Sequence, residues 1–293
     1  MPIITVNDIE ICYEDFGPED APTALLIMGM GAQMTVWPTG LVSELLARGF
    51  RVIRFDNRDS GLSTKSVGDP PDLGAITAAA AAGEPVDAPY TLSTLADDAV
   101  GILDHFGIDR AHIVGQSFGG MIAQMVALEH PDRVLSLTSI FSMTGDPDVF
   151  QPTPEALETM FAPQPETKAE AIAQSVAASR ITHGSLFDEA EVTAVAIESY
   201  ERSRHPVGGA FQTAAMAATG DRTERLRSLD VPTLVVHGRE DPLIPLACGE
   251  HTAATIPGAD LLVFSRMGHD IPKLYWPALA DAIQNIAVRG EDR

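Results

Sequence analysis

Cysteine is scarce in this chain, which has two among its 293 residues, Cys12 and Cys248. Two thiols cannot build a disulfide framework, and we expect both to be free and partly buried. The Cys and His spacing of a zinc site is also missing, so we expect no metal.

Basic residues are few as well, with 19 Lys and Arg against 41 Asp and Glu and a formal net charge of -22. This charge would repel phosphate backbones and anionic lipid headgroups, so we expect neither nucleic acid nor a membrane as a partner. No apolar run approaches the roughly 18 residues of a membrane span, and residues 1–6 lack the features of a signal peptide. We expect a cytoplasmic protein, and the sequence leaves a homodimer open.

The hydrophobic pattern indicates a parallel sheet. Residues 3–6 and 9–13 alternate around Asn7 and Asp8, which predicts a hairpin. Six later apolar runs do not alternate: Thr23–Ile27, Arg51–Phe55, 111–115, 134–141, 233–237 and Asp260–Phe264. Strands of this kind are buried on both faces, as in a parallel sheet covered by helices. Between or after these runs, apolar residues recur with helical periodicity at 41–48, 93–106, 248–256 and 276–288 and before His130. We predict an α/β fold with a mostly parallel eight-stranded sheet and helices on both faces.

Strand signals stop between residues 144 and 227, where Ala, Glu and Gln are frequent and prolines separate helical stretches. We predict a helical cap over residues 144–227 and a core made of residues 1–143 and 228–293. A cap above the carboxyl ends of the strands would exclude water and shape the substrate pocket. A second biased stretch, residues 78–82, predicts a surface excursion or a short helix.

One motif points to nucleophilic catalysis. Gly115-Gln116-Ser117-Phe118-Gly119 follows a predicted buried strand and precedes a helix. A serine at such a strained strand-to-helix turn needs minimal side chains two residues before and after it. Ser117 is therefore the predicted nucleophile.

A serine hydroxyl needs a base, and the base needs a carboxylate to orient it. The predicted acid is Asp241, after the seventh strand, and the predicted base is His269, after the eighth. Both follow carboxyl ends of strands, where open α/β sheets place their sites. Asp146, Glu240 and Asp270 are the alternatives to Asp241.

These motifs, with the loop of residues 56–61, resemble the α/β-hydrolase superfamily over nearly the whole chain. Within it the sequence is most similar to actinobacterial serine esterases of the aclacinomycin methylesterase type. The shared features are the Met-Gly start of the loop at residues 28–31 and an aspartate in the D-x-R-D-x-G loop. The resemblance implies the α/β-hydrolase fold and a methyl or short-alkyl ester of a small molecule as substrate.

Acyl transfer also needs two N–H donors for the developing oxyanion. The predicted donors are the backbone groups of Phe118 and Met30. Four apolar residues flank the motifs and could line the substrate pocket, although core packing explains them equally well: Trp37, Phe141, Met143 and Met267.

Other polar residues have structural interpretations. His112, His130 and His237 lie within or at the ends of predicted elements and are more often structural than catalytic. Asp56 and Arg58 could bind substrate, but a stabilising ion pair is the more frequent arrangement.

The resulting hypothesis is a cofactor-free serine hydrolase that cleaves a carboxylic ester through an acyl-enzyme. A lactonase, a C–C bond hydrolase or a perhydrolase could use the same three residues. A ligand-binding receptor that kept the fold without turnover is the alternative of another class. An aspartate in place of Ser117 would have indicated haloalkane or epoxide chemistry.

Overall fold

The computed structural model describes residues 1–291, and an eight-stranded sheet forms its centre. The strand order is β1-β2-β4-β3-β5-β6-β7-β8. The first pairings, β1 with β2 and β2 with β4, are antiparallel, and all later ones are parallel. The strand bounds are β1 Ile3–Val6, β2 Ile9–Phe16, β3 Thr23–Ile27, β4 Arg51–Phe55, β5 Ala111–Gln116, β6 Val134–Ile140, β7 Thr233–Gly238 and β8 Asp260–Phe264. The predicted fold class is confirmed.

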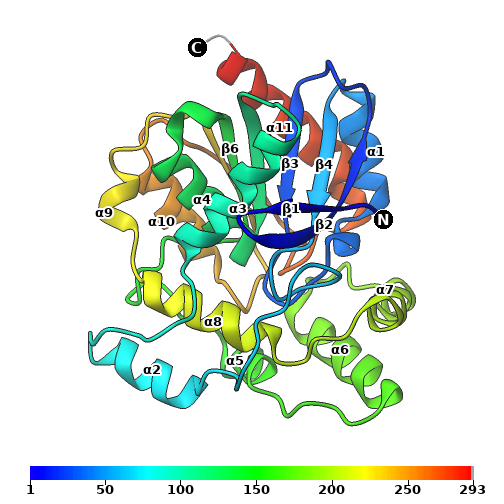
Figure 1. Cartoon of the computed structure of the whole chain (residues 1–293), viewed down its shortest axis with the longest axis vertical. Coiled ribbons are helices and arrows are strands. Elements are labelled where there is room, and N and C mark those ends of the chain that lie inside the picture. Colours follow the sequence, from blue (N-terminus) through cyan, green and yellow to red (C-terminus); the bar gives the residue numbers. More distant parts are fainter. Residues whose placement is uncertain (292–293) are drawn as a thin grey trace.

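Helices cover both faces of the sheet (Figure 1). They are α1 Thr39–Ala47, α2 Leu73–Ala81, α3 Leu92–His105, α4 Phe118–Glu129, α5 Pro154–Met160, α6 Lys168–Thr182, α7 Glu189–Arg202, α8 Gly208–Thr219, α9 Thr223–Leu226, α10 Leu246–Thr255 and α11 Trp276–Glu291. Three short 3-10 helices join them: η1 Met34–Val36, η2 Pro131–Arg133 and η3 Lys273–Tyr275.

The central strands are buried on both sides, which explains why their sequences do not alternate. In β3, Leu25 and Ile27 belong to the core cluster shared with α3 and α4. Ala24 and Leu26 belong to the second cluster, shared with α1 and α11. Two separate apolar layers therefore hold the sheet between helices.

The register of the parallel strands brings their carboxyl ends to one edge. Ile27 pairs with Gly115, Gln116 with Ile140, and Gly238 with Phe264. Because parallel strands end together, the loops after β3, β5, β6, β7 and β8 meet at this edge.

The segment between β6 and β7 contains α5 to α9, and we refer to residues 144–227 as the insertion. Figure 1 shows α5 to α8 below the sheet, with α2 beside α8. The short helix expected near residues 78–82 is thus part of α2, whose first turn is capped by the Asp72 side chain accepting from Gly74 N at 2.9 Å.

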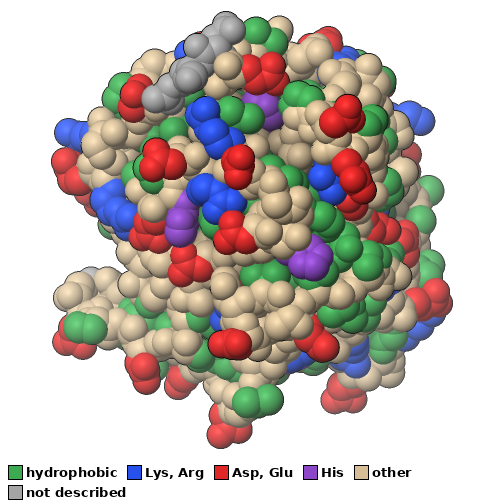
Figure 2. Space-filling model, turned by 45° about the horizontal axis from the view of Figure 1, so that its top comes forward, with side chains coloured by type: hydrophobic (Ala, Val, Ile, Leu, Met, Phe, Trp, Pro, Cys, Tyr) green, Lys and Arg blue, Asp and Glu red, His purple; other side chains and the backbone are tan. Residues whose placement is uncertain are grey.

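Cys12 and Cys248 are both free and buried, as expected. Burial raises the pKa of the Cys248 thiol to about 11, so it stays protonated at neutral pH. Figure 2 shows acidic side chains scattered over the visible face among basic ones. Among residues 1–291, no helix has the length and apolarity needed to cross a membrane.

Candidate active site

Ser117 lies at a tight turn between β5 and α4. Its backbone has φ 54° and ψ −124°, a left-handed conformation that costs about 1–3 kcal/mol for a residue with a side chain. The surrounding structure holds this turn through two hydrogen bonds: Ser117 N donates to Ile140 O at 2.8 Å, and Ser142 Oγ donates to Ser117 O at 2.7 Å.

The glycines of the motif are required by close backbone contacts. A Cβ atom at Gly115 would lie 2.1 Å from Gly119 O, and one at Gly119 would lie 2.2 Å from Ile27 O. Any side chain at either position would push α4 away from the sheet. The crowding that the sequence pattern predicted is therefore present around Ser117.

The structure brings Ser117, His269 and Asp241 together. His269 Nε2 lies 2.8 Å from Ser117 Oγ, and His269 Nδ1 lies 2.8 Å from Asp241 Oδ2. The three residues come from the ends of β5, β7 and β8, although 152 positions separate Ser117 from His269. A neutral imidazole that donates through Nδ1 to the carboxylate can accept the serine proton at Nε2.

Asp241 has a fully buried side chain that is well supplied with hydrogen bonds. Its Oδ1 accepts from Leu243 N and Ile244 N, both at 2.9 Å, which leaves Oδ2 for His269. His237 Nε2 lies 3.8 Å from Asp241 Oδ2 and donates to Ile244 O at 2.8 Å. Burial lowers the pKa of His237, so this ring stays neutral beside the carboxylate.

The three alternative acids have other partners. Asp146 Oδ2 lies 3.6 Å from His251 Nε2, and Glu240 accepts from Ser185. Asp270 Oδ1 accepts from Gly268 N at 3.0 Å. Neither Asp146 nor Glu240 is positioned to orient His269.

The three histidines considered structural have local partners. His112 Nδ1 lies 2.9 Å from Ser136 Oγ between two strands, and His130 Nε2 lies 2.8 Å from Asp97. Asp56 and Arg58 both form ion pairs, although not with each other. Asp56 pairs with Arg202 at 2.7 Å and Arg58 with Asp98 at 2.6 Å.

The two candidate oxyanion donors belong to the two segments next to Ser117. Phe118 is the first residue of α4, and the first N–H groups of a helix have no acceptor within it. The loop of residues 28–31 runs against the serine, since a Cβ at Gly29 would lie 3.4 Å from Ser117 Cβ. Met30 is partly buried in this loop.

The four candidate pocket residues divide into two pairs. Phe141 follows β6, and its ring centroid lies 4.6 Å from that of His269. Met143 is 8% exposed. Phe141, Trp37 and Met267 all belong to the cluster between the sheet, α1 and α11; Phe141 keeps 3% of its surface exposed, and Trp37 and Met267 have none. These two side chains cannot line a pocket in this conformation, because they fill the core beneath the loops.

The insertion reaches the loop that carries His269. His269 N donates to Thr182 O at 2.8 Å, and Asp270 Oδ1 also accepts from Gly184 N at 3.4 Å. Close by, His183 Nδ1 lies 3.7 Å from Asp270 Oδ2. Burial lowers the pKa of His183 and raises that of Asp270, because it disfavours the charged form of each group. Nothing in the sequence indicated Thr182, His183 or Gly184, because the insertion carries no motif.

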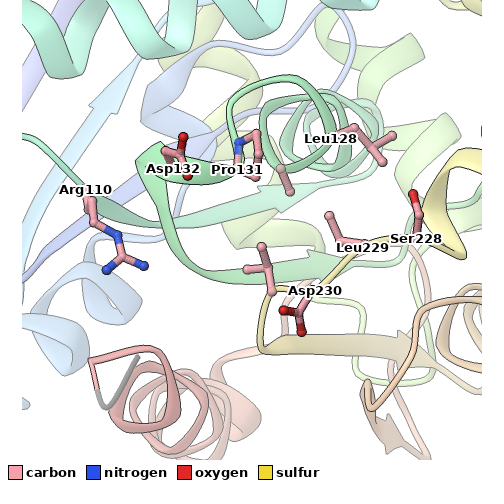
Figure 3. Close-up of a pocket in the computed structure, with 9 residues that line it drawn as sticks. Arg110, Leu128, Pro131, Asp132, Ser228, Leu229 and Asp230 are labelled. Atoms are coloured by element: carbon pink, nitrogen blue, oxygen red, sulfur yellow. The ribbon is translucent and has the colours of Figure 1, made fainter.

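A cavity of about 550 Å³ lies elsewhere, lined by Arg110 and Pro131 and by residues 228–231 (Figure 3). These residues precede β5, β6 and β7, so the cavity lies near the amino ends of the strands, opposite Ser117. None of its lining residues is a predicted site residue. Among residues 1–291, no group of three or more His, Cys, Asp or Glu side chains could hold a metal ion.

The fold, with Ser117, His269 and Asp241 at one edge of the sheet, defines a hydrolase. A model of the α/β hydrolase fold matches residues 22–273, and the chain belongs to this family. Rhodomycin D methylesterase of Streptomyces peucetius is 29% identical over 96% of both chains. A 2-hydroxymuconate semialdehyde hydrolase of Pseudomonas putida is 30% identical over 84% of this chain and 80% of its own. The solved structure of an enol-lactonase from Burkholderia xenovorans covers all of both chains with a TM-score of 0.71 at 23% identity.

Proposed function

We propose that this protein is a serine esterase that hydrolyses a methyl or short-alkyl ester of a small molecule without a cofactor. The observation that carries the proposal is the continuous hydrogen-bonded path from Ser117 Oγ through His269 to Asp241, with 2.8 Å at each step. The similarity to a methylesterase over nearly the full chain supports the choice of ester.

In the proposed reaction, Ser117 Oγ attacks the ester carbonyl carbon while His269 Nε2 takes the hydroxyl proton. The backbone N–H groups of Phe118 and Met30 bind the oxyanion. His269 then protonates the departing alcohol, which leaves an acyl group on Ser117. Water, deprotonated by His269, releases the acid and restores the serine. Asp241 holds the imidazole in the required tautomer.

We also propose that the insertion acts as a cap over the site, with residues 1–143 and 228–293 as the core. The contacts of Thr182 and Gly184 with the His269 loop support this division. Phe141 and Met143 are proposed to form part of the apolar wall next to His269. Three further expectations stay predictions: a cytoplasmic location, the absence of nucleic-acid and membrane partners, and a possible homodimer.

The test is covalent labelling combined with turnover. Wild-type protein should react stoichiometrically with a fluorophosphonate and hydrolyse p-nitrophenyl acetate, and Ser117→Ala should lose both activities while keeping its circular dichroism spectrum. Ser43→Ala is the control for labelling, because Ser43 is an exposed serine whose Oγ donates to Thr39 O of its own helix at 3.0 Å. Turnover by folded Ser117→Ala at the wild-type rate would exclude the mechanism.

A second candidate, hydrolysis of a C–C bond in a dienoic diketone, is favoured by the 30% identity to 2-hydroxymuconate semialdehyde hydrolase. The same three residues would act on it. A panel of methyl esters, lactones and ring-cleavage products would separate the two, with methanol release as the signature of the ester reaction.

A further inference from the structure

Gln212 is a fully buried polar residue in the middle of α8 that contacts two loops of the core. Its Oε1 accepts from Gly31 N at 2.7 Å. Its Nε2 donates to Arg58 O at 2.8 Å and to Ser60 Oγ at 3.1 Å. One carboxamide from the insertion therefore joins the loop of residues 28–31 to the loop of residues 56–61.

The orientation of this amide is fixed by its partners. The N–H of Gly31 can only donate, and the carbonyl of Arg58 can only accept. Exchanging the oxygen and nitrogen of Gln212 would place donor against donor and acceptor against acceptor. Gln212 Oε1 is therefore the atom that faces Gly31 N and accepts from it.

The loop that Gln212 holds has little steric constraint at this point. Gly31 has φ +65°, and a Cβ atom there would meet nothing within 4 Å. With Gly29 and Gly31 on either side, the peptide groups around Met30 could rotate with little steric resistance. Hydrogen bonds therefore contribute to their orientation, together with the packing of the Met30 side chain against the core.

Other hydrogen bonds fix the chain on both sides of Gly31. Asn57 Nδ2 donates to Met28 O at 2.9 Å, and Met34 N donates to Asp56 Oδ1 at 2.8 Å. The bond from Gly31 N to Gln212 acts between these two points, on the peptide group that follows Met30.

We infer that Gln212 is a positioning residue for the oxyanion-binding loop, because its bond to Gly31 N keeps the adjacent N–H of Met30 directed at the carbonyl bound to Ser117. This inference rests on the proposed esterase function. The insertion thereby helps to assemble the catalytic site in addition to covering it, although Gln212 itself does not touch the substrate.

The role has a kinetic signature. Acylation and deacylation both pass through an oxyanion, so a misaligned donor slows both steps by a similar factor. KM for an acyl-enzyme reaction depends on the ratio of the two rate constants, and it should stay nearly constant while kcat falls. Partial unfolding would instead reduce the number of active sites and leave the rate per active site unchanged.

The experiment compares Gln212→Met, which keeps the side-chain length but removes the amide, with Thr219→Val as a matched control. Thr219 lies on the same helix and accepts from Leu92 N at 3.0 Å, so its loss weakens α8 without affecting Gly31. Active sites are counted by exhaustive fluorophosphonate labelling. The measurements are kcat and KM for p-nitrophenyl acetate and the Ki of a trifluoromethyl ketone, which forms a tetrahedral adduct with the serine.

For Gln212→Met we expect kcat per labelled site to fall about 10- to 100-fold. This fall is no larger than the fall in kcat that removal of a whole oxyanion donor causes. KM should change less than about 2-fold, and the Ki should rise in parallel with the loss of kcat/KM. Gln212→Asn, which withdraws the amide from Gly31 by one methylene, should show the same pattern and carries the test if Gln212→Met does not fold.

An unchanged kcat per site in either folded variant would overturn the inference, as would an equal loss in Thr219→Val. Failure of the esterase proposal would appear separately, as a wild-type protein that neither reacts with the fluorophosphonate nor turns over the ester. Both are measured before any change at Gln212.

Discussion

The backbone nitrogen of His269 donates to the carbonyl oxygen of Thr182, 2.8 Å away, so the insertion holds the peptide group of the proposed base itself. The neighbouring Gly184 is packed against the same loop. A Cβ there would lie 2.5 Å from Arg266 O and 2.7 Å from Gly268 N. The position of the imidazole thus depends on a contact between residues 182–184 and 266–269.

Gly184→Ala should therefore displace the His269 loop and lower kcat/KM by about 10-fold or more, because sub-ångström shifts of a catalytic group are costly. The free energy of unfolding should fall by about 1–3 kcal/mol from the overpacking. Gly209→Ala is the control in the same insertion, since a Cβ at Gly209 meets nothing within 4 Å. Equal kcat/KM in the two variants would show that the contact does not position His269.

Asp241→Asn should lower kcat by about 10³- to 10⁴-fold while the protein stays folded, because an amide cannot hold His269 in the productive tautomer. Asp146→Asn is the matched control, as its carboxylate faces His251 at 3.6 Å instead of His269. Steady-state hydrolysis of p-nitrophenyl acetate measures both. A large loss in the Asp146 variant together with an active Asp241 variant would assign the acid to Asp146.

Arg202→Met should lower the free energy of unfolding by about 3–5 kcal/mol, because it leaves the carboxylate of Asp56 buried without its ion-pair partner. Asp56 has no exposed side-chain surface, and Arg202 has 9%. In the control, Arg180→Met, the lost ion pair with Glu189 is more than half exposed on both sides, and a change of less than about 1 kcal/mol is expected. Urea denaturation measures both, and similar losses would argue against a buried pair.

Stability should decrease in mild acid through His112. Burial lowers the pKa of this imidazole to about 4, and the half-exposed carboxylate of Glu291, 3.6 Å away, is too well solvated to reverse that effect. The unfolded chain takes up a proton below about pH 6.5, whereas the folded protein does not, so unfolding becomes easier as the pH falls through this range.

The expected loss from His112 alone is about 2 kcal/mol between pH 7 and pH 5. His112→Asn keeps a polar atom near Ser136 Oγ and removes the titration. The difference in unfolding free energy between wild type and variant, followed by urea denaturation at both pH values, should therefore shift by that amount. A difference independent of pH would contradict the assignment.

The sequence was sufficient for the sheet and for the three proposed catalytic residues because the signals are local. Strands such as β3 are buried on both faces and show it as an unbroken apolar run. Gly115 and Gly119 indicate the turn at Ser117, because the close backbone contacts of this turn require glycine at both positions. Asp241 and His269 were recognisable from short motifs directly after strands.

The sequence was a weaker guide to which individual apolar residues are buried in the core. Trp37, Phe141 and Met267 all flank the motifs in the sequence and all belong to one buried cluster. Of the three, Phe141 has its ring against His269, whereas Trp37 and Met267 have no exposed surface. Which way a loop side chain points depends on the neighbouring elements, here α1 and α11. Asp56 and Arg58 show the same limit for charges, since their partners Arg202 and Asp98 lie far from both in sequence.

The sequence by itself determined the α/β architecture and was enough to propose Ser117, Asp241 and His269 as the catalytic residues, because each depends on a pattern within a few residues. Only the tertiary structure decided that Thr182 holds the His269 loop. Only the tertiary structure showed that Gln212 is bonded to Gly31, which lies 181 positions before it in the sequence. The insertion's helices carry no periodic or motif signal for these contacts. They arise from the packing of separate elements against one edge of the sheet.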